Sequence, residues 1–169
     1  ESRRPARTSG DGELVLLKDQ DRRLWNRRLI AEGQTIVRRC LRRNRPGPYQ
    51  IQAAINAVHS DAASQEAIDW GQILQLYDQL MAVAPSPIVA LHRAVVVGEI
   101  DGPHAALTLV EPLALDHYQP FHAVRADLLR RLGRHAEAAA AYGAAIDGTS
   151  NEAERAFLRK QCQALAPEG

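Results

Sequence analysis

The residues His135, Ala136 and Glu137 have the spacing of the His-x-Glu motif, with which zinc-dependent deaminases bind their metal and transfer a proton. In those enzymes a Pro-Cys-x-x-Cys segment supplies the remaining zinc ligands, and no such segment follows here. The three residues also stand at a turn and at the start of an expected helix. We therefore interpret them as a solvated helix start and predict no metal site.

Other side chains that could carry chemistry also lack a complete motif. His117 and His122 are five residues apart with Pro120 between them, which is the wrong spacing for two metal ligands on one helix. Cys40 and Cys162 have no Cys-x-x-Cys or Cys/His spacing, so they fit structural thiols in a reducing compartment. The sequence has no Gly-x-Ser-x-Gly elbow, and its Gly-Asp-Gly segment lacks the Lys-Ser/Thr of a phosphate-binding loop. We predict no cofactor, no metal and no enzymatic activity.

Charge is unevenly distributed along this chain of 169 residues, although its formal net charge is only +1. Residues 1–48 hold thirteen Lys and Arg against six Asp and Glu, whereas residues 49–169 hold eight against fourteen. This asymmetry indicates either two docked modules or a basic face that meets a partner. No apolar run approaches the ~18 residues of a membrane span and no signal peptide is visible, so we expect a cytoplasmic protein without a membrane partner.

Four pairs of arginines dominate the basic part of the chain and are expected on the polar side of one helix. Phosphate contact is one interpretation. We favour the other, in which these side chains keep an exposed face soluble or meet acidic side chains. Aromatic residues do not interleave with the pairs, which argues against single-stranded nucleic acid as the partner. The pairs are Arg22 and Arg23, Arg27 and Arg28, Arg38 and Arg39, and Arg42 and Arg43.

The sequence predicts three segments. Residues 1–20 are expected to form a basic arm with a short extended run, LVLLK, and residues 21–48 a long basic helix with its linker. Residues 49–169 are expected to form helical repeats. Apolar residues recur three or four apart in the long helix, which predicts one buried stripe behind a cap at Asp19 or Asp21. The stripe comprises Leu24, Trp25, Leu29, Ile30, Gly33, Ile36, Val37, Cys40 and Leu41.

Proline, glycine and capping residues predict about seven more helices in residues 49–169, joined mostly by short turns. Pro112 is expected to shorten its helix, because proline lacks the N–H that a helix interior needs. The last helix is expected to end near Pro167. The expected N-terminal caps are Asp69, Ser86 followed by Pro87, and Thr149 with Glu152 as a capping box.

The stretch DLLRRLGRHAEAAAAYGAAI has the pattern of a tetratricopeptide (TPR) repeat. Small residues lie where two helices cross closely, a glycine takes the left-handed turn, and an aromatic ring fills the gap to the next repeat. Residues 73–85 and 95–107 match this pattern more loosely. We predict an all-α fold, a right-handed α-solenoid of about eight helices in TPR-like pairs, preceded by the basic arm. The matching residues are Ala126, Leu129, Gly133, Ala138, Tyr142 and Ala145.

Helical solenoids bind partner segments along a groove formed by the first helix of each pair. Polar residues on these otherwise apolar helices are therefore candidates for a protein-binding groove. In the other interpretation, they satisfy each other or the helix ends inside the stack. The candidates are Gln52, Asn56, His59, His92, Arg93, Arg125 and Asp127.

In order and nearly end to end, the sequence resembles the TPR-like C-terminal extension of bacterial extracytoplasmic-function (ECF) RNA polymerase sigma factors. The usual residue of that family before Arg93 is Asn, and His92 stands there in this chain. The blocks that carry the resemblance are GELVLLKDQDRRLWNRRLIAEG, PGPYQIQAAINAVH, DWGQILQLYDQL, PSPIVALHRAVVVGEIDGP and LLRRLGRHAEAAAAY.

The resemblance implies that sigma regions 2 and 4 lie upstream in the same protein, where they bind core RNA polymerase and read the promoter. DNA is then contacted through those domains rather than through this chain. For the chain itself it implies regulation of transcription initiation through protein contacts with the sigma domains, RNA polymerase or a regulator protein. The alternatives are a free-standing TPR-like adaptor without sigma activity and, more remotely, an enzyme accessory domain that uses the histidines.

Overall fold

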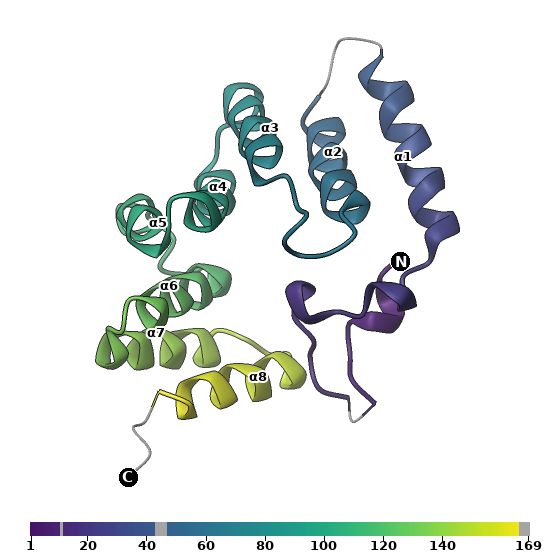
Figure 1. Cartoon of the computed structure of the whole chain (residues 1–169). Coiled ribbons are helices and arrows are strands. Elements are labelled where there is room, and N and C mark those ends of the chain that lie inside the picture. The colour runs from purple at the N-terminus through teal and green to yellow at the C-terminus, as the bar shows by residue number, and fades with distance from the viewer. Residues whose placement is uncertain (11, 43–46, 166–169) are drawn as a thin grey trace. The chain divides into compact units, whose positions relative to one another are not determined.

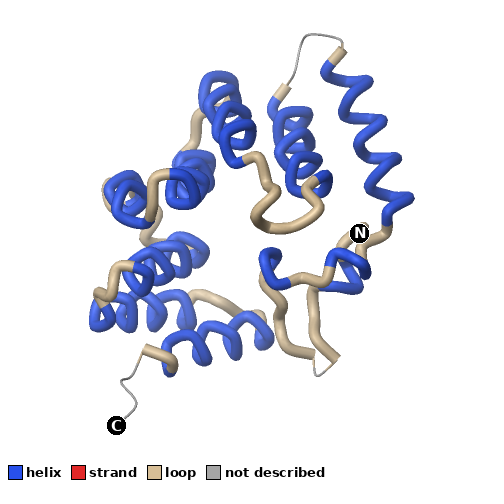
Figure 2. Tube along the Cα trace, in the orientation of Figure 1, coloured by secondary structure: helices blue, strands red, loops and turns tan. Residues whose placement is uncertain are grey.

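The computed structural model describes residues 1–10, 12–42 and 47–165 of the chain. All regular structure in these ranges is helical (Figure 1 and Figure 2), and extended pairing there is limited to an isolated bridge between Thr8 and Leu14. The prediction of an all-α fold is confirmed. The α-helices are α1 (Arg27–Leu41), α2 (Pro48–Asp61), α3 (Trp70–Val83), α4 (Pro87–Ile100), α5 (Pro103–Val110), α6 (Gln119–Arg131), α7 (His135–Asp147) and α8 (Glu152–Gln163).

The helices belong to two compact units, the N-terminal unit Glu1–Pro85 and the C-terminal unit Ser86–Gly169. In the N-terminal unit α1 packs on α2 and α2 on α3. In the C-terminal unit each helix from α4 to α8 packs on the next along the chain. Packing of each helix on its sequence neighbours is typical of helical repeats, whereas the right-handed winding of all eight helices stays a prediction. No helix in the described ranges has the length and apolarity needed to cross a membrane.

Local capping chemistry sets the helix boundaries of the middle of the chain. The Asp69 carboxylate accepts a hydrogen bond from the Gln72 N–H at 2.8 Å and begins α3. The Ser86 hydroxyl accepts from the Val89 N–H at 3.1 Å and begins α4. α5 ends at Val110, before Pro112 is reached. These boundaries confirm the predictions, because each depends on residues next to the helix end.

The first long helix begins later than its apolar pattern predicts. Asp21 does act as a cap, but it accepts from the Arg23 N–H at 2.9 Å and holds only a 3-10 turn, Arg22–Leu24. α1 starts behind a second cap, Asn26, whose side chain accepts from the Leu29 N–H at 3.1 Å. Two side chains that bind nearby backbone N–H groups thus compete within six residues, and the second one starts the α-helix.

The cap of the last helix also differs from the prediction. Asn151, not Thr149, is the N-cap, and its side chain accepts from the N–H groups of Ala153 and Glu154 at 3.0 and 3.2 Å. Thr149 instead donates its hydroxyl to the Glu154 carboxylate at 2.7 Å, so the expected pairing with Glu152 is wrong. Asn is at least as good a cap as Thr. α8 ends at Gln163, and the expected end near Pro167 lies outside the described residues.

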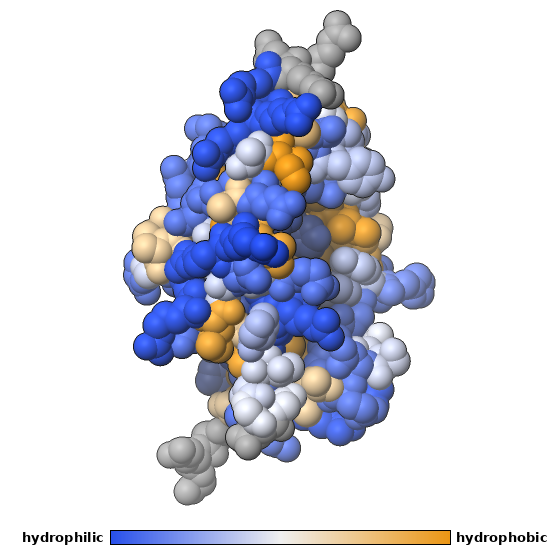
Figure 3. Space-filling view, turned by 90° about the vertical axis from the view of Figure 1, so that its right-hand side faces the viewer, coloured by the Kyte–Doolittle hydropathy of each residue, from blue (hydrophilic) through white to orange (hydrophobic). Residues whose placement is uncertain are grey.

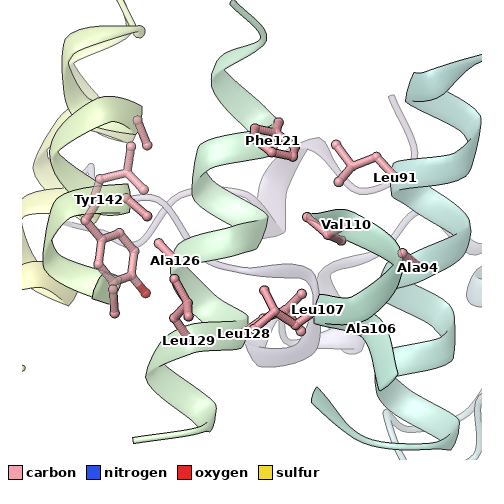
Figure 4. Close-up of a cluster of buried hydrophobic side chains, with 14 of the residues drawn as sticks. Leu91, Ala94, Ala106, Leu107, Val110, Phe121, Ala126, Leu128, Leu129 and Tyr142 are labelled. Carbon is pink, nitrogen blue, oxygen red and sulfur yellow. The ribbon is translucent and has the colours of Figure 1, made fainter. Parts of the chain in front are cut away.

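The TPR-like pattern corresponds to the hydrophobic core of the C-terminal unit. Figure 4 shows Tyr142 and Leu129 between α6 and α7, and Leu91, Val110 and Phe121 between α4, α5 and α6. The small residues of the pattern are fully buried, which allows the two helix backbones to approach closely. The predicted burial of the small residues at the helix crossing is therefore confirmed, whereas the Tyr142 ring lies between α6 and α7 and not in a gap to a following repeat. The buried small residues are Ala126, Ala138 and Ala145.

The turn between α6 and α7 requires glycine at position 133. Gly133 has a φ of +72°, and the two N–H groups at the turn bind back to the helix, Gly133 to the Arg130 carbonyl and Arg134 to the Leu129 carbonyl, both at 3.0 Å. This is the hydrogen-bond pattern of a Schellman motif, in which the left-handed residue is usually glycine.

Replacing Gly133 by alanine lowers the free energy of unfolding of the C-terminal unit by about 1–2 kcal/mol, because a Cβ is strained in the left-handed region. Gly143→Ala is the matched control: Gly143 lies inside α7 and a Cβ there meets no atom within 4 Å. Gly143→Ala raises the free energy of unfolding by up to about 1 kcal/mol, since alanine favours the helical conformation more than glycine does. Urea unfolding followed by circular dichroism measures the stability of both variants. Equal effects of the two changes would contradict the requirement for glycine at position 133.

Candidate protein-interaction site

Three of the predicted groove residues lie on one face of α2. Gln52, Asn56 and His59 are spaced by four and three residues, which places them above one another on a helix. The Asn56 side-chain amide donates to the Gln52 carbonyl at 3.0 Å, and its oxygen accepts from the Arg3 guanidinium at 3.5 Å. Gln52 and Asn56 are exposed. The basic arm therefore reaches the polar stripe of α2.

His59 is half-buried at the end of this stripe. Its ring meets that of Trp70 edge-on, with 5.5 Å between centroids. Burial, and then the positive charges of Arg3 and Arg22, lower the pKa of His59 below its ordinary value. Both causes disfavour the charged imidazolium, so the ring is neutral at neutral pH. His59 is packed within the N-terminal unit more than it is presented to a partner.

Arg22, in the turn between the basic arm and α1, ties this segment to α2. Its guanidinium Nη1 donates to the backbone carbonyls of His59 at 3.0 Å and Ala62 at 2.6 Å, and the group stacks 4.6 Å from the Trp25 ring centroid. These carbonyls lie at the C-terminal end of α2, where helices leave acceptors unsatisfied and where a cation is favourable. Arg22 was grouped by sequence with the basic face, but the structure uses it as a link between segments.

The arginines of α1, together with Arg42 just after its last residue, form an exposed strip. At ~100° per residue they fall within about one third of the helix circumference. Arg23 precedes the helix and pairs with Asp21 at 2.8 Å, and Arg43 lies outside the described residues. Within the described ranges no ion pair neutralises the strip, which leaves a positive surface. We call it the arginine strip; it consists of Arg27, Arg28, Arg38, Arg39 and Arg42.

The opposite side of α1 carries the apolar stripe, and this stripe is only partly covered. Ile30 is buried, but Leu29 and Ile36 expose 37% and 56% of their surface. The prediction of one buried stripe is therefore wrong for α1. Figure 3 faces the side of the molecule on which α1 lies, and hydrophobic residues show there between hydrophilic ones. The side chain of Leu41 is not among those described.

A groove of about 380 Å³ runs between α1 and α2, and no motif in the sequence indicated it. Gly33 leaves a gap at its centre, because a Cβ built there meets no atom within 4 Å. The Gln34 side chain donates to the Asp61 carboxylate and links the two helices. We call this the α1–α2 groove; it is lined by Ser2, Leu29, Ile30, Gly33, Gln34, Ile36, Val37, Ala53, Asn56, Ala57 and Ser60.

The other predicted groove residues lie in the C-terminal unit. His92 is exposed, although partial desolvation lowers the pKa of its imidazole, and Arg93 beside it on α4 is half-buried. Arg125 faces the Glu111 carboxylate at 3.9 Å. Asp127 binds the Arg130 guanidinium at 2.6 Å. Arg125 and Asp127 are thus engaged in ion pairs within their own unit.

Arg131 was not predicted as a structural residue but joins α6 to α4. Its guanidinium donates to the Glu99 carboxylate at 3.0 Å and to the Gly98 carbonyl at 3.1 Å. Both partners lie more than thirty residues earlier in the chain. No local pattern could have identified this contact.

Two of the residues considered for metal chemistry, Glu137 and His122, contact partners close in the chain. Glu137 forms a two-pronged hydrogen bond with the Arg134 guanidinium, both at 2.7 Å, and this lowers the pKa of the Glu137 carboxyl. The His122 ring contacts the Asp116 carbonyl at 2.8 Å. In the part of the chain that is described, no three His, Cys, Asp or Glu side chains are grouped so as to hold a metal ion.

Comparison with known proteins gives a partial match and one relative. Residues 1–41 match a family of unknown function, DUF6596. The chain is 47% identical over 169 residues to an uncharacterized protein of Rhizobium meliloti (strain 1021), and the alignment covers 99% of the chain and 40% of that protein. The chain thus spans less than half the length of this relative. No solved structure matches the chain.

Proposed function

We propose that the chain is a non-enzymatic, protein-binding regulatory domain of a bacterial ECF sigma factor. The observation that carries the proposal is the resemblance of five sequence blocks, in order, to the TPR-like extension of such factors. A bacterial relative of which this chain covers only 40% of the length has room for further domains. Upstream sigma regions 2 and 4 would occupy that room and would contact promoter DNA.

The arrangement of the helices supports the protein-binding part of the proposal. Helices packed on their sequence neighbours form rigid surfaces on which partner segments bind. The N-terminal unit adds two features that suit a protein partner, the α1–α2 groove and the arginine strip. We propose the sigma domains of the same protein, core RNA polymerase or a regulator protein as partners, in the cytoplasm, where transcription takes place.

Promoter-dependent transcription tests this proposal. The full-length protein that contains this chain is combined with core RNA polymerase, and transcription from its promoter is measured. Gln52→Ala combined with Asn56→Ala reduces transcription by about threefold to tenfold, because truncation of central interface residues typically costs about 1 kcal/mol or more. His59 is left unchanged, since its ring packs on Trp70 and its loss would also destabilise the unit.

The matched control is Gln75→Ala with Gln79→Ala, two exposed glutamines of α3. We expect it to leave transcription unchanged, and the far-UV circular dichroism of both double variants to equal that of the original protein. Absence of any promoter-dependent transcription by the full-length protein would overturn the sigma factor proposal and favour the free-standing adaptor. Transcription that does not respond to either double variant would contradict a role for the α2 stripe.

A further inference from the structure

We propose that the α1–α2 groove is the docking site for an acidic amphipathic helix of a partner protein. Apolar side chains of that helix enter the groove, and its carboxylates face the arginines beside it. This inference deepens the proposed protein-binding function and rests on that part of it, but it does not require that the parent protein be a sigma factor.

The shape of the groove fits one helix. From Leu29 to Val37 its α1 wall extends over about 12 Å, or roughly two helical turns. A helix that docks in a groove presents apolar side chains at positions i, i+3 or i+4, and i+7, which span the same distance. Ala53 and Ala57 give the α2 wall short side chains, and Gly33 leaves space opposite them.

The exposure of the groove lining indicates a surface that a partner covers. Leu29 and Ile36 are 37% and 56% exposed although they belong to the apolar stripe of an amphipathic helix. Contiguous exposed apolar groups with a polar rim mark interaction sites in water-soluble domains. Covering them with apolar side chains of a partner is favourable by roughly 25 cal/mol for each Å² removed from water.

Two arginines beside the groove favour an acidic partner. α1 carries four arginines and a single acidic residue, Glu32, which stands three residues after Leu29 and four before Ile36 and so also borders the groove. Arg39 follows Ile36 by three residues, so it stands next to the groove on the α1 side. On the α2 side, Arg3 lies over the groove-lining Asn56. The Asp61 carboxylate is held by Gln34. Arg39 and Arg3 therefore offer positive charge to carboxylates of a bound helix, one from each side of the groove, and Glu32 shares the α1 edge with Arg39.

A helix fits these observations better than a nucleic acid or a membrane surface. The groove has no aromatic side chain on which a base could stack. A bilayer binds an amphipathic helix through a freely exposed apolar face, whereas the apolar stripe of α1 faces α2 across a recess. A recessed apolar floor with charged edges is the arrangement that a single amphipathic helix fills.

Binding of a designed peptide to the full 169-residue chain tests the inference. The probe is a fluorescein-labelled peptide of about 16 residues with Leu at positions i, i+4 and i+7 and Glu on its other face. We expect saturable binding by fluorescence anisotropy that weakens as NaCl rises from about 0.05 M to about 0.5 M, because salt screens the exposed arginines. A scrambled peptide and one with Lys in place of Glu should bind at least about tenfold more weakly.

Two variants locate the binding on the groove. Gly33→Leu fills its centre and should weaken binding at least about tenfold, while Ala140→Leu adds the same side chain to an exposed position of α7 and should not. Arg39→Glu should weaken binding about threefold to tenfold, and Arg159→Glu, an equal charge change on α8, should not. Circular dichroism checks that all four remain helical.

The inference is overturned if Gly33→Leu binds the acidic peptide as well as the original chain does, or if the Lys peptide binds equally well. Tighter binding of a DNA duplex or of phosphatidylserine vesicles than of the peptide would also overturn it. Failure of peptide binding together with transcription that depends on Gln52 and Asn56 leaves the proposed function standing without this site. Peptide binding without any promoter-dependent transcription supports the groove and rejects the sigma factor proposal.

Discussion

Replacing Tyr142 by alanine lowers the free energy of unfolding of the C-terminal unit by about 3–5 kcal/mol, the range typical of a buried aromatic side chain cut back to alanine. The Tyr142 side chain is only 3% exposed and belongs to the hydrophobic cluster of this unit (Figure 4). Ala126 and Ala138 are fully buried in the same cluster, and their short side chains cannot fill the space that the ring leaves. Urea unfolding monitored by circular dichroism, with hydrogen exchange of α6 and α7, measures the loss.

Two controls separate ring burial from other effects of the change. Tyr49→Ala removes a ring that is 82% exposed and should change stability by no more than about 0.5 kcal/mol. Tyr142→Phe keeps the ring and should cost about 1 kcal/mol or less. A loss below about 1 kcal/mol for Tyr142→Ala would show that this ring does not hold the helices together.

Replacing Arg22 by alanine destabilises the attachment of residues 1–25 to α2 by about 2 kcal/mol. The change removes two hydrogen bonds from a charged donor to the His59 and Ala62 carbonyls, each of a kind worth about 1.5–3 kcal/mol before partial solvation is counted. It also removes the cation stacked on Trp25. Hydrogen exchange should accelerate about tenfold or more in residues 1–25 and in the last turn of α2.

Arg23→Ala is the matched control for this prediction. Arg23 neighbours Arg22 in sequence but pairs only with the nearby, solvent-exposed Asp21. Its removal should cost about 0–1 kcal/mol, the usual value of a surface ion pair. The destabilisation by Arg22→Lys should fall between those of Arg22→Ala and Arg23→Ala, because an ammonium cannot present two donors in the fixed geometry of a guanidinium. Equal exchange rates in the Arg22→Ala and Arg23→Ala variants would refute the linking role of Arg22.

Sequence predicts those parts of this fold that depend on residues close together in the chain. Asp69 and Ser86 cap their helices as expected, and Gly133 takes the left-handed conformation that the repeat pattern assigns to it. Each of these features is decided within about one helical turn. Where two caps compete over a few residues, as Asp21 and Asn26 do, the pattern identifies both residues but not which one begins the α-helix.

The candidate site was less predictable because it depends on distant contacts. The carbonyls that bind Arg22 lie 37 and 40 residues away, and its arginine neighbours gave no reason to separate it from the arginine strip. The sequence placed Leu29 and Ile36 on the apolar stripe of α1. It did not indicate how far α2 covers their side chains. The glycine at position 33, within an otherwise wide apolar stripe, was the one local sign of a gap.

The link through Arg22 bears on where this polypeptide can be cut. The family match ends at residue 41, yet Arg22 inside that match binds the carbonyls of residues 59 and 62. A peptide that stops at the family boundary would lose those acceptors and the wall formed by α2, so it would not retain the shape described above. A shortened protein that ends at the Pro85 boundary keeps Arg22 together with both of these acceptors in one compact unit.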